Sequence, residues 1–164
     1  MSENGMWHQS YRPLGDRLIK AAVAGLCGSL AHSLLMYLKT RTGFLPSFQP
    51  YESLQRALGE LTGMAIHPIL PWALSFLNGS TIVGVFFGYS YRSLPGRNGA
   101  IKGALFGILG WASMGLVFFP LIGLGLFAIR AELGAAPAML SLAMVLSYSV
   151  VMGMVYGALE GPGP

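Results

Sequence analysis

The chain has 164 residues, of which 54% are hydrophobic and only 10% are charged. Soluble domains usually carry about 25% Asp, Glu, Lys and Arg, so too few charges are present here to solvate the surface of a globular domain. The net charge of +4 is not gathered into a basic run with interleaved aromatic residues, which argues against nucleic acid as a partner.

Four long apolar blocks follow one another along the chain: Leu18–Leu38, Pro68–Ser90, Ala104–Ala128 and Pro137–Ala158. None contains Asp, Glu or Arg, and Lys20 is the only charged residue inside them. A helix needs about 20 apolar residues to cross the hydrocarbon core of a bilayer. The sequence therefore predicts an all-α membrane protein with four transmembrane helices over residues 18–160, a polar arm over 1–17 and a tail over 161–164.

The first predicted helix, 18–38, carries the best candidate for a functional residue inside the membrane, because ionisable residues at that depth usually mark functional sites. His32 lies about two helical turns before Lys39. It shares a helix face with Gly25 and Gly28, so we expect its side chain to face protein rather than lipid.

The segment between the first two membrane helices has the composition of a short amphipathic helix. In Glu52–Leu61, the residues Leu54, Leu58 and Leu61 fall on one helical face, and the charged residues lie elsewhere. We expect this helix to lie at the membrane interface or to cap the bundle. His67 follows it, just before the second membrane helix and on the same side of the membrane as the end of the first.

Two residues inside the second and third predicted helices call for a structural explanation. Asn78 lies near the middle of the second helix, where we expect a buried amide that bonds another helix, with ligand binding as the alternative. Pro120 lacks an N–H group and should kink the third helix. A tight loop is expected between the third and fourth helices.

Small residues recur about one turn apart in all four predicted helices. Lipid provides little hydrophobic force between helices, so their association depends on close van der Waals packing, which small residues permit. We therefore expect helix contacts, within the chain or with another subunit, at Gly25, Gly28, Gly84, Gly88, Gly99, Gly103, Gly107, Gly153 and Gly157. A Lys-x4-Gly-x2-Gly pattern that begins at Lys20 and again at Lys102 also allows two tandem helical hairpins.

His32 and His67 are the candidate cofactor-binding residues, because neutral imidazole ligates haem iron. Such a pair would require both side chains to face one cavity; the alternative is a packed, hydrogen-bonded His32. A haem or a pigment is thus the cofactor that the sequence leaves open. No metal-ion motif and no catalytic motif is present, and the single cysteine, Cys27, cannot form an intrachain disulfide, so we expect no enzymatic activity.

The basic residues are distributed unequally between the two sides of the predicted bundle. Six lie on the side of the termini (Arg12, Arg17, Lys20, Arg92, Arg97 and Lys102), and four lie on the other side (Lys39, Arg41, Arg56 and Arg130). Cytoplasmic loops carry an excess of Lys and Arg. We therefore expect a multi-pass protein of the cell inner membrane with both termini in the cytoplasm.

Four stretches, "AGLCGSLAHSLLMY", "ALGELTG", "LNGSTIVGVFFG" and "GALFGILGWASMGLVFFPLIGLGLF", together resemble a group of small bacterial and archaeal four-helix membrane proteins of unknown function. The resemblance implies the four-helix fold and adds no activity. Our leading hypothesis is a non-catalytic accessory subunit of a larger membrane complex, respiratory or photosynthetic, whose partners are the lipid bilayer and other membrane subunits. The alternatives are a small transporter or channel, with a path lined by Asn78, His32 and the Pro120 kink, and a b-type haem protein.

Overall fold

The computed structural model describes residues 14–161, and all regular structure in that part of the chain is helical. Four helical spans are long and apolar enough to cross a membrane. Span 1 is α1 (Leu14–Thr42) and span 4 is α7 (Ala136–Glu160). Span 2 consists of α3 (Ile69–Asn78), the π-helix η1 (Gly79–Val83) and α4 (Gly84–Ser90), whereas span 3 consists of α5 (Gly99–Ser113), the π-helix η2 (Met114–Phe118) and α6 (Phe119–Leu121).

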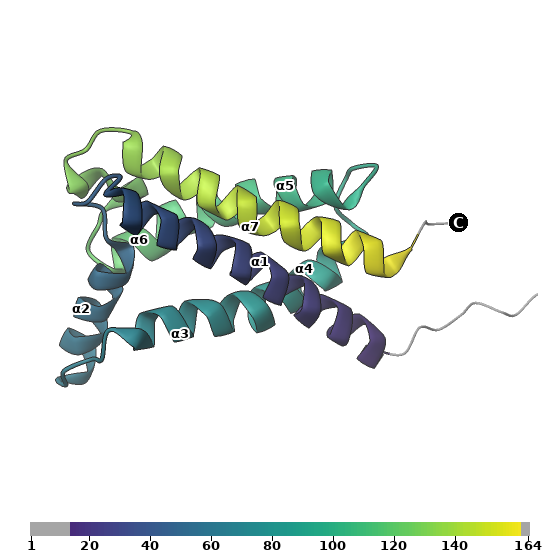
Figure 1. The fold of residues 1–164 in the computed structure, drawn as a ribbon, viewed down its shortest axis with the longest axis horizontal. Helices are drawn as coiled ribbons and strands as arrows, with labels where there is room; N and C mark the ends of the chain where they lie inside the picture. Colours follow the sequence, from purple (N-terminus) through teal and green to yellow (C-terminus); the bar gives the residue numbers. More distant parts are fainter. Residues whose placement is uncertain (1–13, 162–164) are drawn as a thin grey trace, which may run out of the picture.

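These elements confirm the predicted all-α, multi-pass architecture. The predicted amphipathic helix is α2 (Pro50–Thr62), which lies across the end of the bundle opposite the start of α1 and the end of α7 (Figure 1). Whether the two hairpins are a repeat stays a prediction. The first is closed by α2 and the second by a 3-10 helix, η3 (Leu126–Ala131).

The ends of several elements differ from the prediction. Residues 14–17 of the predicted polar arm already form the first turn of α1, where Asp16 pairs with Lys20 at 2.7 Å, while residues 1–13 and 162–164 lie outside the described part. Span 3 begins at Gly99, because the Asn98 side chain accepts a hydrogen bond from the backbone N–H of Ile101 at 2.9 Å and caps the helix.

The expectation that the third helix continues to residue 128 and ends in a tight loop is wrong. The helix ends at Leu121, directly after Pro120, and the chain then turns through Gly123 and Gly125, both of which have positive φ angles. Glycine adopts this backbone conformation without steric penalty, so the apolar segment leaves the helix although its hydropathy remains high. The connection spans residues 122–135 and contains η3.

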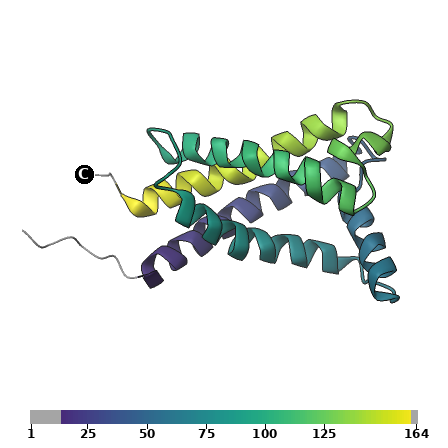
Figure 2. The same ribbon diagram turned by 180° about the vertical axis from the view of Figure 1, so that it is seen from behind.

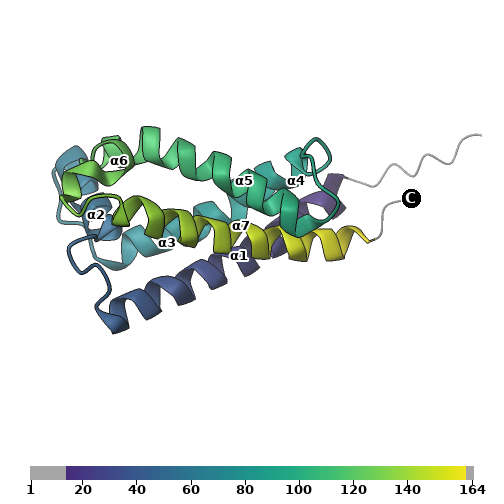
Figure 3. The ribbon, with the colours of Figure 1, turned by 90° about the horizontal axis from the view of Figure 1, so that it is seen from above.

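Span 4 is the central helix of the bundle. Seen from above, α7 runs between α5 and α1 (Figure 3), and it packs against both. α1 in turn packs against η1 and α4, and the view from behind shows α5 and span 2 in front of α1 and α7 (Figure 2). Spans 2 and 3 meet through aromatic rings, with Phe106 at 5.1 Å from Phe87 and at 5.9 Å from Phe86.

Glycine permits backbone contact between α5 and α7. A Cβ atom added at Gly99 would overlap the carbonyl oxygen of Gly153, and one added at Gly103 would overlap the carbonyl oxygen of Ser149. Gly107 faces the Ser149 side chain, and Gly157 faces Gly99. The two backbones are therefore closer than any side chain would allow, as is typical of small-residue helix pairs in membranes.

A second set of small residues joins α1 to spans 2 and 4. A Cβ added at Gly25 would lie 2.7 Å from the carbonyl oxygen of Gly79, and one at Gly84 would lie 2.7 Å from that of Ala21. Gly28 faces the backbone and ring of Tyr148, and Gly88 lies against Ala21 and Tyr156. All nine glycines singled out in the sequence thus lie at helix contacts within this chain.

Two groups of buried side chains close the bundle at its ends. Near the start of α1 and the end of α7, the group consists of Ala21, Ala24, Phe87, Met152 and Tyr156. At the opposite end it consists of Phe48, Phe119, Ile122 and Ala128. The buried ammonium group of Lys39 donates a hydrogen bond to the carbonyl oxygen of Phe48 at 2.7 Å, which fixes the loop after α1.

We predict that Gly103→Leu destabilises the protein and that Gly110→Leu leaves its stability nearly unchanged, although both residues lie on α5. A side chain at Gly103 meets the backbone of α7, which no rotamer can avoid, whereas a Cβ at Gly110 meets no atom within 4 Å. Gly103→Leu should lose at least about 1–3 kcal/mol of stability, the usual cost of overpacking. Thermal unfolding and size-exclusion profiles in detergent measure both variants, and equal melting temperatures would contradict the close contact.

Candidate functional site

A cavity of 490 Å³ lies inside the membrane region between the two buried groups. Its size is within the range of small-molecule sites, about 300–1,000 Å³. Part of its lining is a face of α1, formed by Ser29, His32, Ser33 and Met36. Another part is a face of α7, formed by Ser141, Met144, Val145, Tyr148 and Ser149. Both sets follow the three- and four-residue spacing that brings side chains onto one face of a helix.

The cavity opens between spans 2 and 3. Its exposed lining residues are Leu74 and Asn78 on α3, Gly110 on α5 and Phe118 on η2, and no lining residue of α1, α2 or α7 is exposed. Because these four residues lie within membrane-spanning helices, the opening faces the bilayer laterally. We call it the lateral opening.

A polar cluster of three side chains lies in the cavity near α2. The Tyr51 hydroxyl is 3.3 Å from Nε2 of His32 and 3.1 Å from Oγ of Ser75, so it joins α2 to α1 and α3. Its ring packs on Trp72 at 4.5 Å between centroids. Burial raises the pKa of the Tyr51 phenol, against the opposing effect of the hydrogen bond with Ser75, so the hydroxyl keeps its proton.

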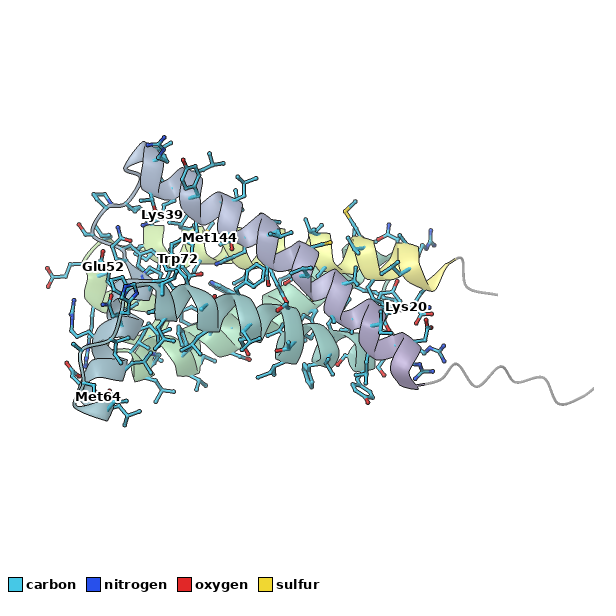
Figure 4. The ribbon with its side chains drawn as sticks, turned by 60° about the horizontal axis from the view of Figure 1, so that its bottom comes forward. Lys20, Lys39, Glu52, Met64, Trp72 and Met144 are labelled. Carbon is cyan, nitrogen blue, oxygen red and sulfur yellow. The ribbon has the colours of Figure 1, made fainter. Side chains whose placement is uncertain are left out.

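The position of His32 is fixed from a third side. Its imidazole lies beside the backbone of Met144 on α7 as well as beside Tyr51. Figure 4 shows Met144 and Trp72 in the same half of the bundle as Lys39, away from Lys20. His32 is therefore held among α1, α2 and α7 and faces protein, in agreement with the expectation from its helix face.

The π-helix η1 forms one edge of the cavity through Gly79 and Val83. A π-helical turn shifts the backbone hydrogen bonds by one residue, and the affected carbonyl groups need other donors inside a membrane. Tyr148 donates its hydroxyl to the carbonyl oxygen of Gly79 at 2.5 Å, and Ser80 donates to that of Phe76 at 2.8 Å. Ser29 reaches the same Phe76 oxygen at 3.5 Å.

The π-helix η2 forms the edge on span 3 through Met114 and Phe118. It directly precedes Pro120, whose ring would clash with the carbonyl of Leu116 in a regular α-helix. In place of a kink within a continuous helix, the chain forms the π-helical turn η2 before Pro120, and the helix ends at Leu121. Since π-helical turns are frequent at functional sites, their presence on both edges of one cavity points to that cavity as the site.

The structure does not bring the two candidate haem ligands together. His67 is exposed in the loop before α3, where its Nδ1 accepts a hydrogen bond from the backbone N–H of Ile69 at 3.3 Å. It is not among the residues that line the cavity containing His32. Within residues 14–161, no three His, Cys, Asp or Glu side chains form a group that could hold a metal ion.

Asn78 is exposed at the lateral opening, and the expectation of a buried amide is therefore wrong for this chain. Its side chain lies where spans 2 and 3 separate, so no neighbouring helix is close enough to accept its hydrogen bonds. Across the described part of the chain, neither the Asn78 amide nor the Ser33 hydroxyl forms a hydrogen bond. Both groups line the cavity.

Sequence reasoning missed most of the polar lining, above all Tyr51, Ser75 and Tyr148. Tyr51 has the composition signal of an interfacial aromatic residue, and the serines look like ordinary small packing residues. The available signal was the spacing of hydroxyl and imidazole groups on single helix faces, in Ser29, His32 and Ser33 and in Ser141, Tyr148 and Ser149.

The fold and the cavity together define a multi-pass helical membrane protein with a laterally open intramembrane cavity. The chain belongs to a family of unknown function, DUF6789, whose model matches residues 15–163 and so confirms the resemblance found in the sequence. No curated protein and no solved structure shows detectable similarity to the chain.

We predict that Tyr148→Phe destabilises the protein by about 0.5–1.5 kcal/mol, the usual net value of one hydrogen bond, because the Gly79 carbonyl loses a donor inside the membrane. The matched control is Tyr89→Phe, because Tyr89 is 59% exposed and lies outside the cavity. Thermal unfolding in detergent should show a lower melting temperature only for the first variant. An unchanged melting temperature would mean that η1 does not depend on this hydrogen bond.

Proposed function

We propose that this protein is a non-catalytic membrane protein that binds a lipophilic small molecule in its intramembrane cavity. One observation carries the proposal: a 490 Å³ space with a polar cluster on its wall lies among the membrane-spanning helices. Chains gain stability by filling apolar space, so a large cavity with polar groups aimed into it favours a bound ligand over a packing defect.

The lateral opening supports loading of the ligand from the bilayer. The exposed lining residues belong to spans 2 and 3, at depths where the surrounding solvent is lipid. Towards the start of α1 the bundle is closed by fully buried Phe87 and Met152 and by Tyr156, which is 1% exposed. This closure favours a binding site over the channel that was one of the sequence-based alternatives.

The hypothesis of an accessory subunit stays a prediction, and the glycine contacts do not add support to it. It depended on small-residue helix faces that could receive another subunit, and the nine glycines concerned all contact helices of this chain. The b-type haem alternative is not supported by the site, since His67 lies outside the cavity of His32.

Closing the cavity should abolish binding. We predict that Gly110→Leu, which places a side chain at the lateral opening without a clash, removes any lipophile that co-purifies with the wild-type protein. Extraction of the protein purified in a mild detergent, followed by mass spectrometry of the extract, compares the variants.

The matched control is Gly15→Leu, because Gly15 has equally open surroundings and lies outside the cavity. The control should retain the co-purifying lipophile at the wild-type level. Equal recovery from both variants, or no specific lipophile with any of them, would reject the proposed function.

We also propose an inner-membrane location with the start of α1 and the end of α7 on the cytoplasmic side. The basic residues Arg17, Lys20, Arg92, Arg97 and Lys102 at that end outnumber Lys39, Arg41, Arg56 and Arg130 at the other. In a Cys27→Ala background, a cysteine at exposed Ser93 should resist a membrane-impermeant thiol reagent in intact cells, and one at exposed Gly43 should react. The reverse labelling pattern would show that the start of α1 and the end of α7 lie on the outer side of the membrane.

A further inference from the structure

We infer that the occupant of the cavity is an uncharged lipophile that carries a hydroxyl or carbonyl oxygen, recognised by Tyr51, Ser75 and the neighbouring polar groups of α1 and α3. This inference rests on the proposed function and adds the chemical class of the ligand. The neutral oxygen of the ligand lies near α2, and its hydrocarbon chain occupies the remainder of the cavity.

The charge of the lining favours an uncharged ligand. No Asp, Glu, Lys or Arg is among the residues that line the cavity. An ionised headgroup without a partner at this depth is strongly disfavoured by the loss of its hydration. The nearest buried cation, Lys39, already donates to the carbonyl of Phe48 and is not part of the lining. The basic group in the lining is the His32 imidazole, which is already engaged by the neutral Tyr51 hydroxyl, so a fatty-acid carboxylate or an ammonium group would find no fixed counter-charge.

The polar cluster has hydrogen-bonding capacity left for a ligand oxygen. The Tyr51 hydroxyl has one hydrogen and two acceptor lone pairs, and so has the Ser75 hydroxyl. Their hydrogen bonds with each other and with His32 leave at least one further hydrogen-bonding position, donor or acceptor, on each oxygen. A ligand hydroxyl can donate to these oxygens. A ligand carbonyl can accept if the Tyr51 or Ser75 hydrogen rotates towards it.

Two further polar side chains beside that cluster have no partner in the described part of the chain. Asn78 lies one turn after Ser75 on α3, and Ser33 follows His32 on α1, so both extend the same polar wall. Within residues 14–161 they have no hydrogen-bond partner. A polar group without a partner in an apolar medium is costly, so a ligand oxygen that reaches the Asn78 amide or the Ser33 hydroxyl gains from groups that are otherwise unsatisfied.

The rest of the lining accepts a hydrocarbon chain. Beyond the polar wall the cavity is bounded by aliphatic, aromatic and methionine side chains: Met36, Leu74, Phe106, Met114, Phe118, Phe119, Met144 and Val145. Methionine side chains adapt easily to different apolar shapes. This apolar lining accommodates hydrocarbon chains of different shapes, so selectivity comes from the polar cluster that contacts the oxygen-bearing end of the ligand.

The inference can be tested with photoactivatable probes of equal chain length in nanodiscs of uncharged lipid. Four diazirine probes are compared: an alkane, a primary alcohol, a ketone and an alkyl sulfonate, which stays charged. Cross-linked peptides are quantified by mass spectrometry over the cavity-lining segments of α1, α3 and α7. We expect the alcohol or the ketone to label these segments about five-fold more than the alkane, as one additional hydrogen bond provides, and the sulfonate to label least.

Two variants assign the preference to the polar cluster. Tyr51→Phe keeps the ring packed on Trp72 and removes the hydroxyl, and Ser75→Ala tests the same cluster from α3 should the first variant fold poorly. Each should lower labelling by the oxygen-bearing probe towards that of the alkane and leave alkane labelling unchanged. Tyr89→Phe, at an exposed tyrosine outside the cavity, should change neither.

The outcomes separate this inference from the proposed function. Equal labelling by the alcohol, ketone and alkane probes, or strongest labelling by the sulfonate, would overturn the inference while cavity binding stands. Preference for an oxygen-bearing probe that survives both cluster variants would also overturn it. If no probe labels the cavity above the level seen with Gly110→Leu, the proposed function itself fails.

Discussion

The structure depends on one constraint: inside a bilayer, every backbone polar group must find a partner within the protein. Regular α-helices satisfy this constraint by themselves, but the two π-helical segments of this chain do not. Around η1 the required donors come from hydroxyl groups, with Tyr148 reaching across from α7 and Ser29 from α1. These hydrogen bonds tie the widened turn to α7 and α1, which also line the cavity.

The contact between α5 and α7 changes where the glycine stripe of α5 ends. At Gly99 and Gly103, α5 lies directly on the backbone of α7, and at Gly107 it lies on the Ser149 side chain. Beyond that point the contact is made by Trp111, whose indole N–H donates to the carbonyl of Ala138 and to Ser141, each at 3.1 Å. Gly110 on α5 and Ser141 on α7, next to this contact, line the cavity, and the Phe127 ring packs on Trp111 at 4.9 Å between centroids.

The helices could be predicted from the sequence because hydropathy and length are local properties, and so could the glycine contacts, because a one-turn spacing is visible in one dimension. The end of span 3 could not, since Gly123 and Gly125 leave the helix without any change in hydropathy. His32 was found because an ionisable residue is rare at its depth. Tyr51 was not, because only the tertiary structure shows that an apparently interfacial aromatic residue turns into the bundle.

The position of the lateral opening also determines which ligand concentration controls the occupancy of the cavity. A site that faces water samples the dissolved concentration of its ligand, whereas Leu74, Asn78, Gly110 and Phe118 border hydrocarbon. The governing quantity is then the mole fraction of the ligand among the lipids. A compound almost insoluble in water could saturate such a site, and adding inert lipid to a fixed amount of protein and ligand would empty it by dilution in two dimensions.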